Sequence, residues 1–306
     1  MTRPLDRAGA RELSSVTELA TLPDAPRDTE DDIVVDDSDA SLGSNQSGLR
    51  RFMRRYYNWW VGTLAVIVFL GLWEWASDTG VVNPLFGSSP HRIFDELKTL
   101  IETGQLWPNV WISAEEFAWG FLIAIVVAIP LGILIGWYRP IEAIFSPFVT
   151  FLNAVPRVAL LPLLIIWVGI GIELKIAVVL LGALIAILIN TITGIKSLDP
   201  ALLTMAKSFG ASDFKIFRTI ALPGSVPYIL SGIRVGLGHA LTGVVVGELY
   251  ASTTGVGHLI AVAGNTFQTD LVFAGVVIIA VFGLIATGIL TKLEQHFQTW
   301  RQTASK

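Results

Sequence analysis

The segment IAVVLLGALIAILINTITGI, residues 176–195, runs for twenty residues without a charged side chain. A helix of about 20 apolar residues is long enough to cross the hydrocarbon core of a bilayer. The segment TMAKSFGASDFKIFRTIALP, residues 204–223, follows closely and is polar and of mixed charge, so it must lie outside the bilayer. This alternation predicts an integral membrane protein in which polar loops connect apolar helices.

The composition of the whole chain supports the same prediction. Of its 306 residues, 53% are hydrophobic and 15% are charged, whereas a soluble domain carries about 25% charged residues. There is no cysteine, and the 4 histidines are scattered without metal-ligand spacing. No catalytic constellation is visible, and the basic residues are few and lie beside apolar spans. We therefore expect neither an enzyme, nor a metal site, nor a nucleic-acid-binding protein.

Six stretches are long and apolar enough to span a membrane. They occupy residues 59–76, 112–137, 143–168, 174–195, 225–250 and 270–292. Two of them are interrupted by charge, because 143–168 contains Arg157 and 225–250 contains Arg234 and Glu248. Pro156 and Pro162 flank Arg157 and predict a kinked or broken helix there. The expected fold is therefore all-α, with six transmembrane helices and a two-helix loop between the fourth and fifth.

The placement of lysine and arginine predicts the orientation of these helices. Four arginines within residues 50–55 precede the first span, and basic residues cluster again within residues 196–218. Loops rich in Lys and Arg face the cytoplasm, so both termini and residues 198–222 are expected there. The opposite loops are balanced in charge, with Lys175 beside Glu173.

The first 48 residues differ from the rest of the chain. They hold eleven acidic residues against four arginines and no aromatic residue. Such a segment buries too little apolar area to offset its ordering entropy. We predict that residues 1–48 are a disordered, acidic, cytoplasmic tail and that residues 49–306 form the transmembrane domain. A solvated tail without a partner and a regulatory tail are both compatible with this composition.

Two short helices are expected on the outer side. Ser89 and Pro90 are typical of a helix start, and apolar residues then recur at helical spacing until Gly104. Residues 251–269 are too polar and glycine-rich to span a membrane, and a short helix is predicted around residues 257–263.

Residues 198–222 carry the signals of two short helices joined at a glycine. Asp199-Pro200 is typical of a helix N-terminus, and Gly210 permits a sharp turn. Ser212 or Asp213 can cap a second helix over residues 213–220. Pro223 and Pro227 are expected to break that helix before the fifth span.

This loop resembles the coupling loop of ABC-transporter permeases. Ala206, Gly210, Ile220, Leu222 and Pro223 match that family's pattern, while Thr204 stands where an acidic residue is usual. The resemblance extends to the nitrate, sulfonate, taurine and bicarbonate branch of ABC importers. It rests on NPLFGSSPHRIFDEL (83–97), LLPLLIIWVGIGIELKI (160–176), NTITGIKSLDPALL (190–203), PYILSGIRVGLGHAL (227–241) and TDLVFAGVVIIAVFGLI (269–285).

The resemblance implies a homodimeric permease of the bacterial inner membrane that imports a small, anionic solute such as a sulfonate, nitrate, bicarbonate or organic acid. It also implies a soluble substrate-binding protein on the outer face and two ATPase subunits, which bind ATP and Mg, on the loop. The implied coupling residues are Thr204, Ala206, Phe209, Gly210, Asp213, Phe217, Ile220, Leu222 and Pro223. Independently, the sequence has no G-x-x-x-x-G-K-[ST] phosphate loop, so energy from ATP must enter through a partner. The alternative is an ordinary loop that only reverses the chain.

Polar residues inside the spans are the candidates for a translocation path. They are Asn153, Arg157, Arg234, His239 and Glu248. Arg157 would attract an anion, or instead pair with Glu142 or Glu248, or extend to the membrane surface. Arg234, His239 and Glu248 serve either the path or structural pairing, and Asn153 could instead hydrogen-bond to another helix.

Glycines spaced four apart predict close contacts between helices. Three such pairs occur, Gly132 with Gly136, Gly232 with Gly236, and Gly243 with Gly247. Two other functions are compatible with six spans. One is a membrane assembly subunit without a pathway, and the other is an ion-coupled carrier, which would need an inverted repeat that is not visible.

Overall fold

The computed structural model describes residues 46–81, 83 and 86–298, and within these ranges every regular element is a helix. The predicted tail, residues 1–48, lies outside the described residues except for 46–48, which begin the first helix. The described part of the chain divides into two units, with the boundary between Leu64 and Ala65. The first helix crosses that boundary, and the contacts described below all lie within 65–306.

The helices follow one another in this order. They are α1 (Gln46–Asp78), α2 (Pro90–Glu102), α3 (Leu106–Trp137), α4 (Arg139–Ala154), the 3-10 turn η2 (Arg157–Leu160), α5 (Leu161–Val168), α6 (Ile172–Lys196), α7 (Pro200–Ser208), α8 (Asp213–Ile216), the π-turn η3 (Phe217–Ala221), α9 (Leu222–Ala251), α10 (Val256–Asn265) and α11 (Thr269–Gln298). The all-α prediction is confirmed.

Five stretches of helix are long and apolar enough to cross a membrane in the described part of the chain. They are Trp60–Asp78, Leu106–Trp137, Ile172–Lys196, Asp213–Ala251 and Thr269–Gln295. The remaining predicted span is not straight. Arg139–Ala154 and Arg157–Val168 meet at an angle of 98°, and the break falls where Pro156 and Arg157 predicted one.

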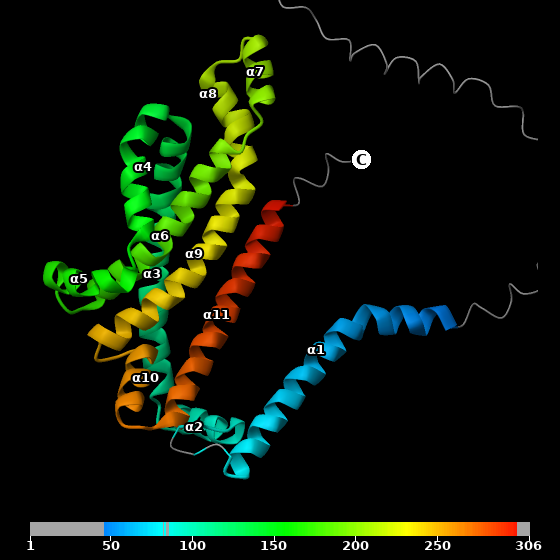
Figure 1. Cartoon of the computed structure of the whole chain (residues 1–306), viewed down its shortest axis with the longest axis vertical. Coiled ribbons are helices and arrows are strands. Elements are labelled where there is room, and N and C mark those ends of the chain that lie inside the picture. The colour runs from blue at the N-terminus through cyan, green and yellow to red at the C-terminus, as the bar shows by residue number, and fades with distance from the viewer. Residues whose placement is uncertain (1–45, 82, 84–85, 299–306) are drawn as a thin grey trace, which may run out of the picture. The chain divides into compact units, whose positions relative to one another are not determined.

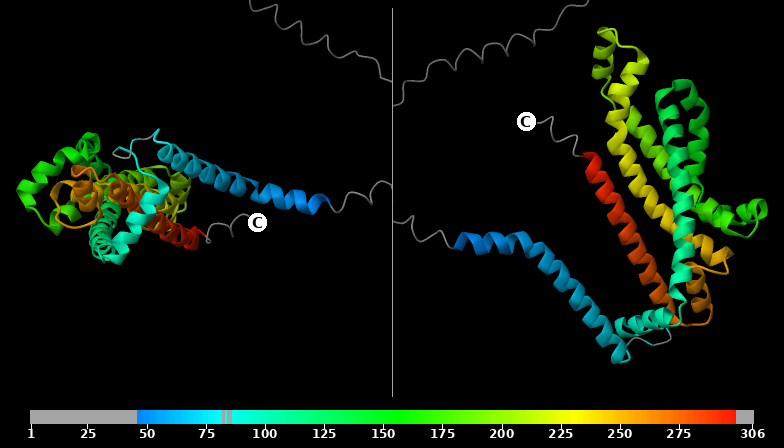
Figure 2. Two further views of the ribbon diagram at one scale, coloured as in Figure 1. Left: turned by 90° about the horizontal axis from the view of Figure 1, so that it is seen from below. Right: turned by 180° about the vertical axis from the view of Figure 1, so that it is seen from behind.

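Helix α6 lies between α3 and α9, as Figures 1 and 2 show from opposite sides. Glycines of α3 lie against larger side chains of α6, Gly132 against Thr191 and Gly136 against Ile195. A Cβ atom on Gly132 would lie 2.7 Å from the Cβ of Thr191. The residue numbers rise together along both helices, so α3 and α6 run parallel.

The contact between α6 and α9 is built in the same way but runs antiparallel. Gly182 of α6 lies under the backbone of His239, where a Cβ would be 2.8 Å from the carbonyl oxygen. Gly232 lies against Asn190, and Gly243 lies against the backbone at Val179. The glycine pairs in the second and fifth spans predicted close helix contact. This is confirmed, because these glycines of α3 and α9 pack against α6.

The expectation that Pro223 and Pro227 end a helix is wrong. Residues 213–251 are continuously helical, because the π-turn η3 joins α8 to α9. The Leu222 N–H bonds to the Phe217 carbonyl across this wider turn. Pro223, which has no N–H group to donate, directly follows this turn, and Pro227 lies inside α9.

Two shorter helices lie at the end of α6 and α9 that is remote from α7 and α8 (Figure 1). Helix α2 starts as predicted, with the Ser89 hydroxyl accepting the Arg92 N–H at 3.4 Å, and it is followed by Gly104 at φ +71°. The short helix predicted around residues 257–263 is confirmed as α10. We call the end of the helices that carries α2 and α10 the α10 end. The opposite end carries α7 and α8, which form a helical hairpin, and we call it the hairpin end.

Candidate functional site

The hairpin formed by residues 198–222 has the caps that its sequence predicts. The Asp199 carboxylate accepts the Ala201 N–H at 2.8 Å at the start of α7. Gly210 adopts φ +75°, and the Ser212 hydroxyl accepts the Lys215 N–H at 3.4 Å at the start of α8. Two short helices are therefore joined by a defined turn.

The predicted coupling residues differ in exposure. Phe209 is 85% exposed and Phe214 is 71% exposed. Phe217 instead packs edge-on against Trp137 of α3, with ring centroids 5.3 Å apart. Thr204, Gly210, Asp213 and Pro223 are exposed, while Ala206, Ile220 and Leu222 are partly buried. The hairpin thus offers two free aromatic rings, and its third aromatic residue connects it to α3.

The break between α4 and α5 positions Asn153 and Arg157. Asn153 is exposed and Arg157 is partly buried. Neither pairing considered for Arg157 occurs, because Glu142 pairs with Lys196 and Glu248 bonds to Ser113. Arg157 is instead close enough to His239 of α9 to interact with it electrostatically.

The charges of the fifth span divide between two sites. Arg234 forms an ion pair with Glu294 of α11, whose side chain is buried. Glu248, in the last turns of α9, belongs to a separate cluster at the α10 end. His239, which lies between them, is exposed. The five path candidates therefore do not form one site in a single chain, although Arg157 and His239 are within long-range electrostatic reach of each other.

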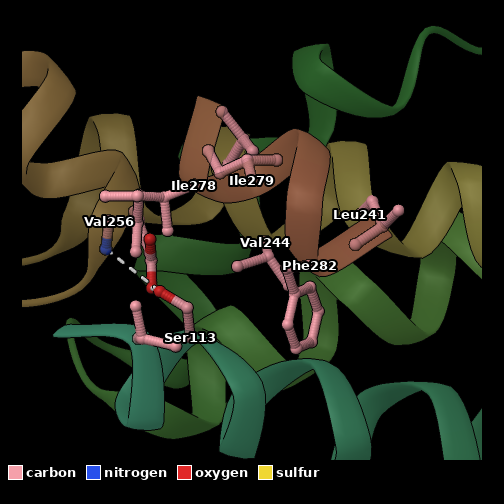
Figure 3. A pocket seen from close by; sticks show the side chains of 10 residues that line it. Ser113, Leu241, Val244, Val256, Ile278, Ile279 and Phe282 are labelled. Atoms are coloured by element: carbon pink, nitrogen blue, oxygen red, sulfur yellow. Dashed lines mark hydrogen bonds between the residues drawn. The ribbon is translucent and has the colours of Figure 1, made fainter. Parts of the chain in front are cut away.

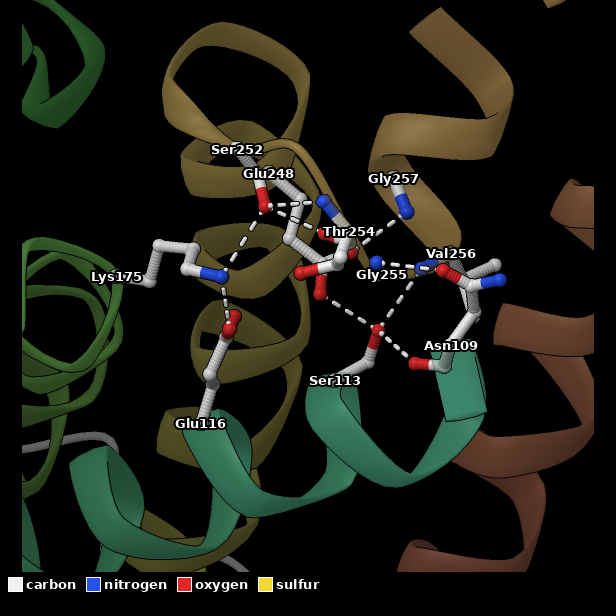
Figure 4. A network of polar contacts seen from close by, with 10 residues as sticks. All are labelled: Asn109, Ser113, Glu116, Lys175, Glu248, Ser252, Thr254, Gly255, Val256 and Gly257. Carbon is white, nitrogen blue, oxygen red and sulfur yellow. Dashed lines mark hydrogen bonds and ion pairs between the residues drawn. The ribbon is translucent and has the colours of Figure 1, made fainter. Parts of the chain in front are cut away.

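Glu248 takes part in a buried polar network at the α10 end (Figure 4). Glu116 of α3 forms an ion pair with Lys175 of α6, and all three charged residues are at most 5% exposed. The two carboxylates are within electrostatic range of each other and of Lys175. The expectation that Lys175 lies beside Glu173 in a solvated loop is therefore wrong. Its ammonium also donates to the Ser252 hydroxyl at 3.1 Å.

The same network holds the N-terminus of α10. The Gly257 N–H donates to Glu248 Oε2 at 2.6 Å, and the Ser113 hydroxyl donates to Oε1 at 2.6 Å. The Gly255 N–H donates to Asn109 Oδ1 at 2.8 Å. A helix start leaves its first N–H groups without partners, and here α3 and α9 supply the acceptors. We call Asn109, Ser113, Glu116, Lys175 and Glu248 the polar network.

A small apolar cavity of about 20 Å³ adjoins the polar network (Figure 3). Its lining includes Ser113, Glu248 and side chains from α3, α9, α10 and α11, among them Val244, Ile278 and Phe282. Apolar walls keep the local dielectric constant low, which strengthens the interactions among the buried charges.

The chain belongs to the family of binding-protein-dependent transport system inner membrane components, whose family model matches residues 128–299. Within this family, the curated relatives place the chain among the ABC-transporter permeases of the sulfonate and taurine branch. A Bacillus subtilis permease named for aliphatic sulfonate transport, SsuC, is 35% identical over 82% of this chain and 91% of its own. The taurine transport system permease protein TauC of Escherichia coli is 31% identical over 78% of this chain and 88% of its own.

A solved structure shows the same fold. It is that of a bacterial ABC transporter involved in the import of the acidic polysaccharide alginate, and its matching chain is 16% identical with a TM-score of 0.52. The match covers 81% of this chain and 98% of that one. The chain is thus a multi-pass inner-membrane permease of an ABC importer, and the predicted family is confirmed.

Sequence reasoning missed several residues of these sites. Glu116 and Lys175 lie in different spans, and the sequence gives no indication of which spans are neighbours. A search for opposite charges inside spans could have proposed the pair. Glu294, the partner of Arg234, lies two residues beyond the predicted sixth span, so this search would have missed it. Asn109 and Ser113 carried no signal, because uncharged polar residues are common at helix ends.

Replacing Lys175 tests the polar network. Lys175→Met leaves two buried carboxylates without a cation, which should destabilise the protein by about 3–5 kcal/mol. Adding Glu116→Gln should restore part of that loss, because one unpaired charge is removed. Melting temperatures of the purified protein in detergent measure both effects. Additive losses in the double variant would contradict the coupling.

Proposed function

We propose that this permease moves a small, anionic, sulfonate-type solute from a soluble substrate-binding protein into the cytoplasm, driven by two ATPase subunits. The observation that carries the proposal is the α7–α8 hairpin. It presents Phe209 and Phe214 to solvent at the tip of a helix pair, α6 and α9, that crosses the membrane. Exposed aromatic rings on a fixed turn are typical anchors for a protein partner.

The connections of the hairpin support a role in coupling. It follows α6 directly and continues into α9 through the π-turn, while Phe217 contacts Trp137 of α3. A movement imposed on α7 and α8 would therefore act on three packed spans together. Rigid-body movement of packed helices is a common form of such switches. ATP and Mg would be bound by the ATPase subunits and not by this chain.

The basic residues support an orientation with the hairpin end in the cytoplasm. Lys196, Lys207, Lys215 and Arg218 all lie at this end, and both termini would then also be cytoplasmic. Trp107 and Trp111, near the start of α3, are exposed. In this orientation they would lie where the bilayer meets water on the side away from the cytoplasm, a position in which tryptophan is enriched.

The exposure of the path candidates supports a homodimer. Asn153 and His239 are exposed on a single chain, and Arg157 is only partly buried. An aqueous path through a membrane needs walls on every side, and a second copy of the chain would supply the facing wall. Arg157 and His239 from both copies would then surround an anion, which fits the sulfonate and taurine named for the relatives.

Transport by the reconstituted complex tests the proposal. The permease, its ATPase and its binding protein are placed in proteoliposomes, and uptake of labelled taurine and ethanesulfonate is measured with and without ATP. ATP-dependent uptake that also requires the binding protein is expected. Uptake that proceeds without an ATPase would contradict the proposal.

A hairpin variant tests the docking site. Phe209→Asp places a charge where an apolar ring meets the partner, so ATPase co-purification and uptake should both fall at least about tenfold. The melting temperature should not change, because Phe209 makes few contacts within the chain. Phe94→Asp, at a similarly exposed aromatic residue of α2, is the control and should keep the ATPase bound. Equal binding by Phe209→Asp would rule out this docking face.

An arginine variant tests the path. Arg157→Gln removes the positive charge and should raise the half-saturating concentration for an anionic substrate, by about tenfold for one lost charge-assisted hydrogen bond. Arg139→Gln, at the exposed start of α4, removes the same charge elsewhere and should leave uptake unchanged. Wild-type uptake kinetics in Arg157→Gln would exclude a path role for this residue.

A further inference from the structure

Phe267 has an unusual backbone conformation for its side chain. Among the described residues it is the one non-glycine residue with positive φ, at +55°. Five glycines share the positive range, among them Gly104 and Gly210, each two residues beyond the end of α2 or α7. A side chain at such a position brings its Cβ close to the backbone, which is why glycine is usual there.

Phe267 ends α10 in the same way that Gly210 ends α7. After α7, the Ala211 N–H bonds to the Ala206 carbonyl at 3.1 Å and the Gly210 N–H to Lys207 at 2.9 Å. After α10, the Gln268 N–H bonds to the Ala263 carbonyl at 2.9 Å and the Phe267 N–H to Gly264 at 3.4 Å. Both helices therefore end in the same C-terminal motif, and the position that Gly210 and Phe267 occupy in it favours glycine. The motif alone therefore does not explain phenylalanine.

Packing does not explain it either. Phe267 is 65% exposed, so its ring gains little from burial in the chain that could offset the strain. Its neighbours Asn265, Thr266 and Gln268 are exposed, polar and uncharged. One aromatic ring thus stands in a polar turn. Backbone strain that the fold does not compensate is typical of functional positions.

The turn is fixed in place. Asp270, in the first turn of α11, accepts a hydrogen bond from the Ser88 hydroxyl at 2.6 Å, and Ser88 is fully buried beside the start of α2. On the other side of Phe267, the two hydrogen bonds of the C-terminal motif hold the turn against the end of α10. The backbone that carries the ring is therefore held in place, which lowers the entropy lost when a partner binds.

We propose that Phe267 is an aromatic anchor for the soluble substrate-binding protein. This rests on the proposed function, which places the α10 end outside the cytoplasm, where that protein arrives. A single aromatic ring within a polar rim is the usual arrangement of a binding hot spot. Because the turn holds no charge, recognition here would come from insertion of the ring into an apolar hollow of the partner.

The other surface that could receive the ring is lipid. Trp107 and Trp111 expose aromatic rings at the same end from ordinary helical positions, so lipid contact does not require a strained residue. Residues 264–269 also lack the lysine and arginine that accompany interfacial anchors. The protein partner is therefore the better match.

The test uses the complete transporter in lipid nanodiscs and the binding protein that supports uptake in proteoliposomes. Phe267→Gly removes the ring and relieves the strain, Phe267→Tyr keeps a ring, and Phe94→Ala removes an exposed ring of α2 as a control. Affinity for the binding protein, its stimulation of ATP hydrolysis, and the melting temperature are measured for each.

Phe267→Gly should bind the binding protein at least about tenfold more weakly while melting at the same or a higher temperature. Phe267→Tyr and the control should stay within about twofold of wild type. Wild-type affinity in Phe267→Gly would overturn the proposal. If that variant also melted lower in nanodiscs but not in detergent, the ring would be assigned to lipid. If the wild-type transporter showed no uptake that depends on a binding protein, the proposed function itself would fail.

Discussion

The close approach of α3 and α9 to α6 is the constraint on which the other features depend. Between membrane helices the hydrophobic effect gives little driving force, so association relies on close packing. Here the packing needs small residues, since a Cβ on Gly132 or Gly182 would enter space already filled by Thr191 or by the backbone of His239. The two contacts place α6 in the centre, parallel to α3 and antiparallel to α9. With three spans fixed side by side, groups from different helices meet at both ends.

At one end this arrangement brings charges together, and at the other it positions the α7–α8 hairpin, which is the proposed docking surface. Glu116, Lys175 and Glu248 come from α3, α6 and α9, and they can pair only because those helices are in contact. Their network in turn holds the first N–H groups of α10. At the hairpin end, α7 and α8 leave the same two helices, α6 and α9. A load applied by an ATPase at Phe209 would thus reach a packed unit and not a single flexible helix.

The sequence predicted the elements better than the contacts between them. Long apolar runs, the caps at Asp199 and Ser89, and the glycines after helices all depend on local physics, and these predictions are confirmed. The continuous helix through Pro223 was missed because it depends on a π-turn, whose five-residue bond has no sequence signal. The pairs Glu116–Lys175 and Arg234–Glu294 were missed because they depend on which spans are neighbours. Phe267 was missed because its strain is a property of backbone conformation.

Replacement of Gly182 tests the central packing claim most directly. Gly182→Ala places a methyl group against the His239 carbonyl, and Gly288→Ala places one in open space on α11. Alanine favours a helix over glycine by about 1 kcal/mol, so helix propensity alone would stabilise both variants. We predict that Gly182→Ala melts at a lower temperature than wild type, with a loss of about 1–3 kcal/mol from overpacking. Gly288→Ala should melt at the wild-type temperature or above. Equal or higher stability of Gly182→Ala would contradict the close α6–α9 contact.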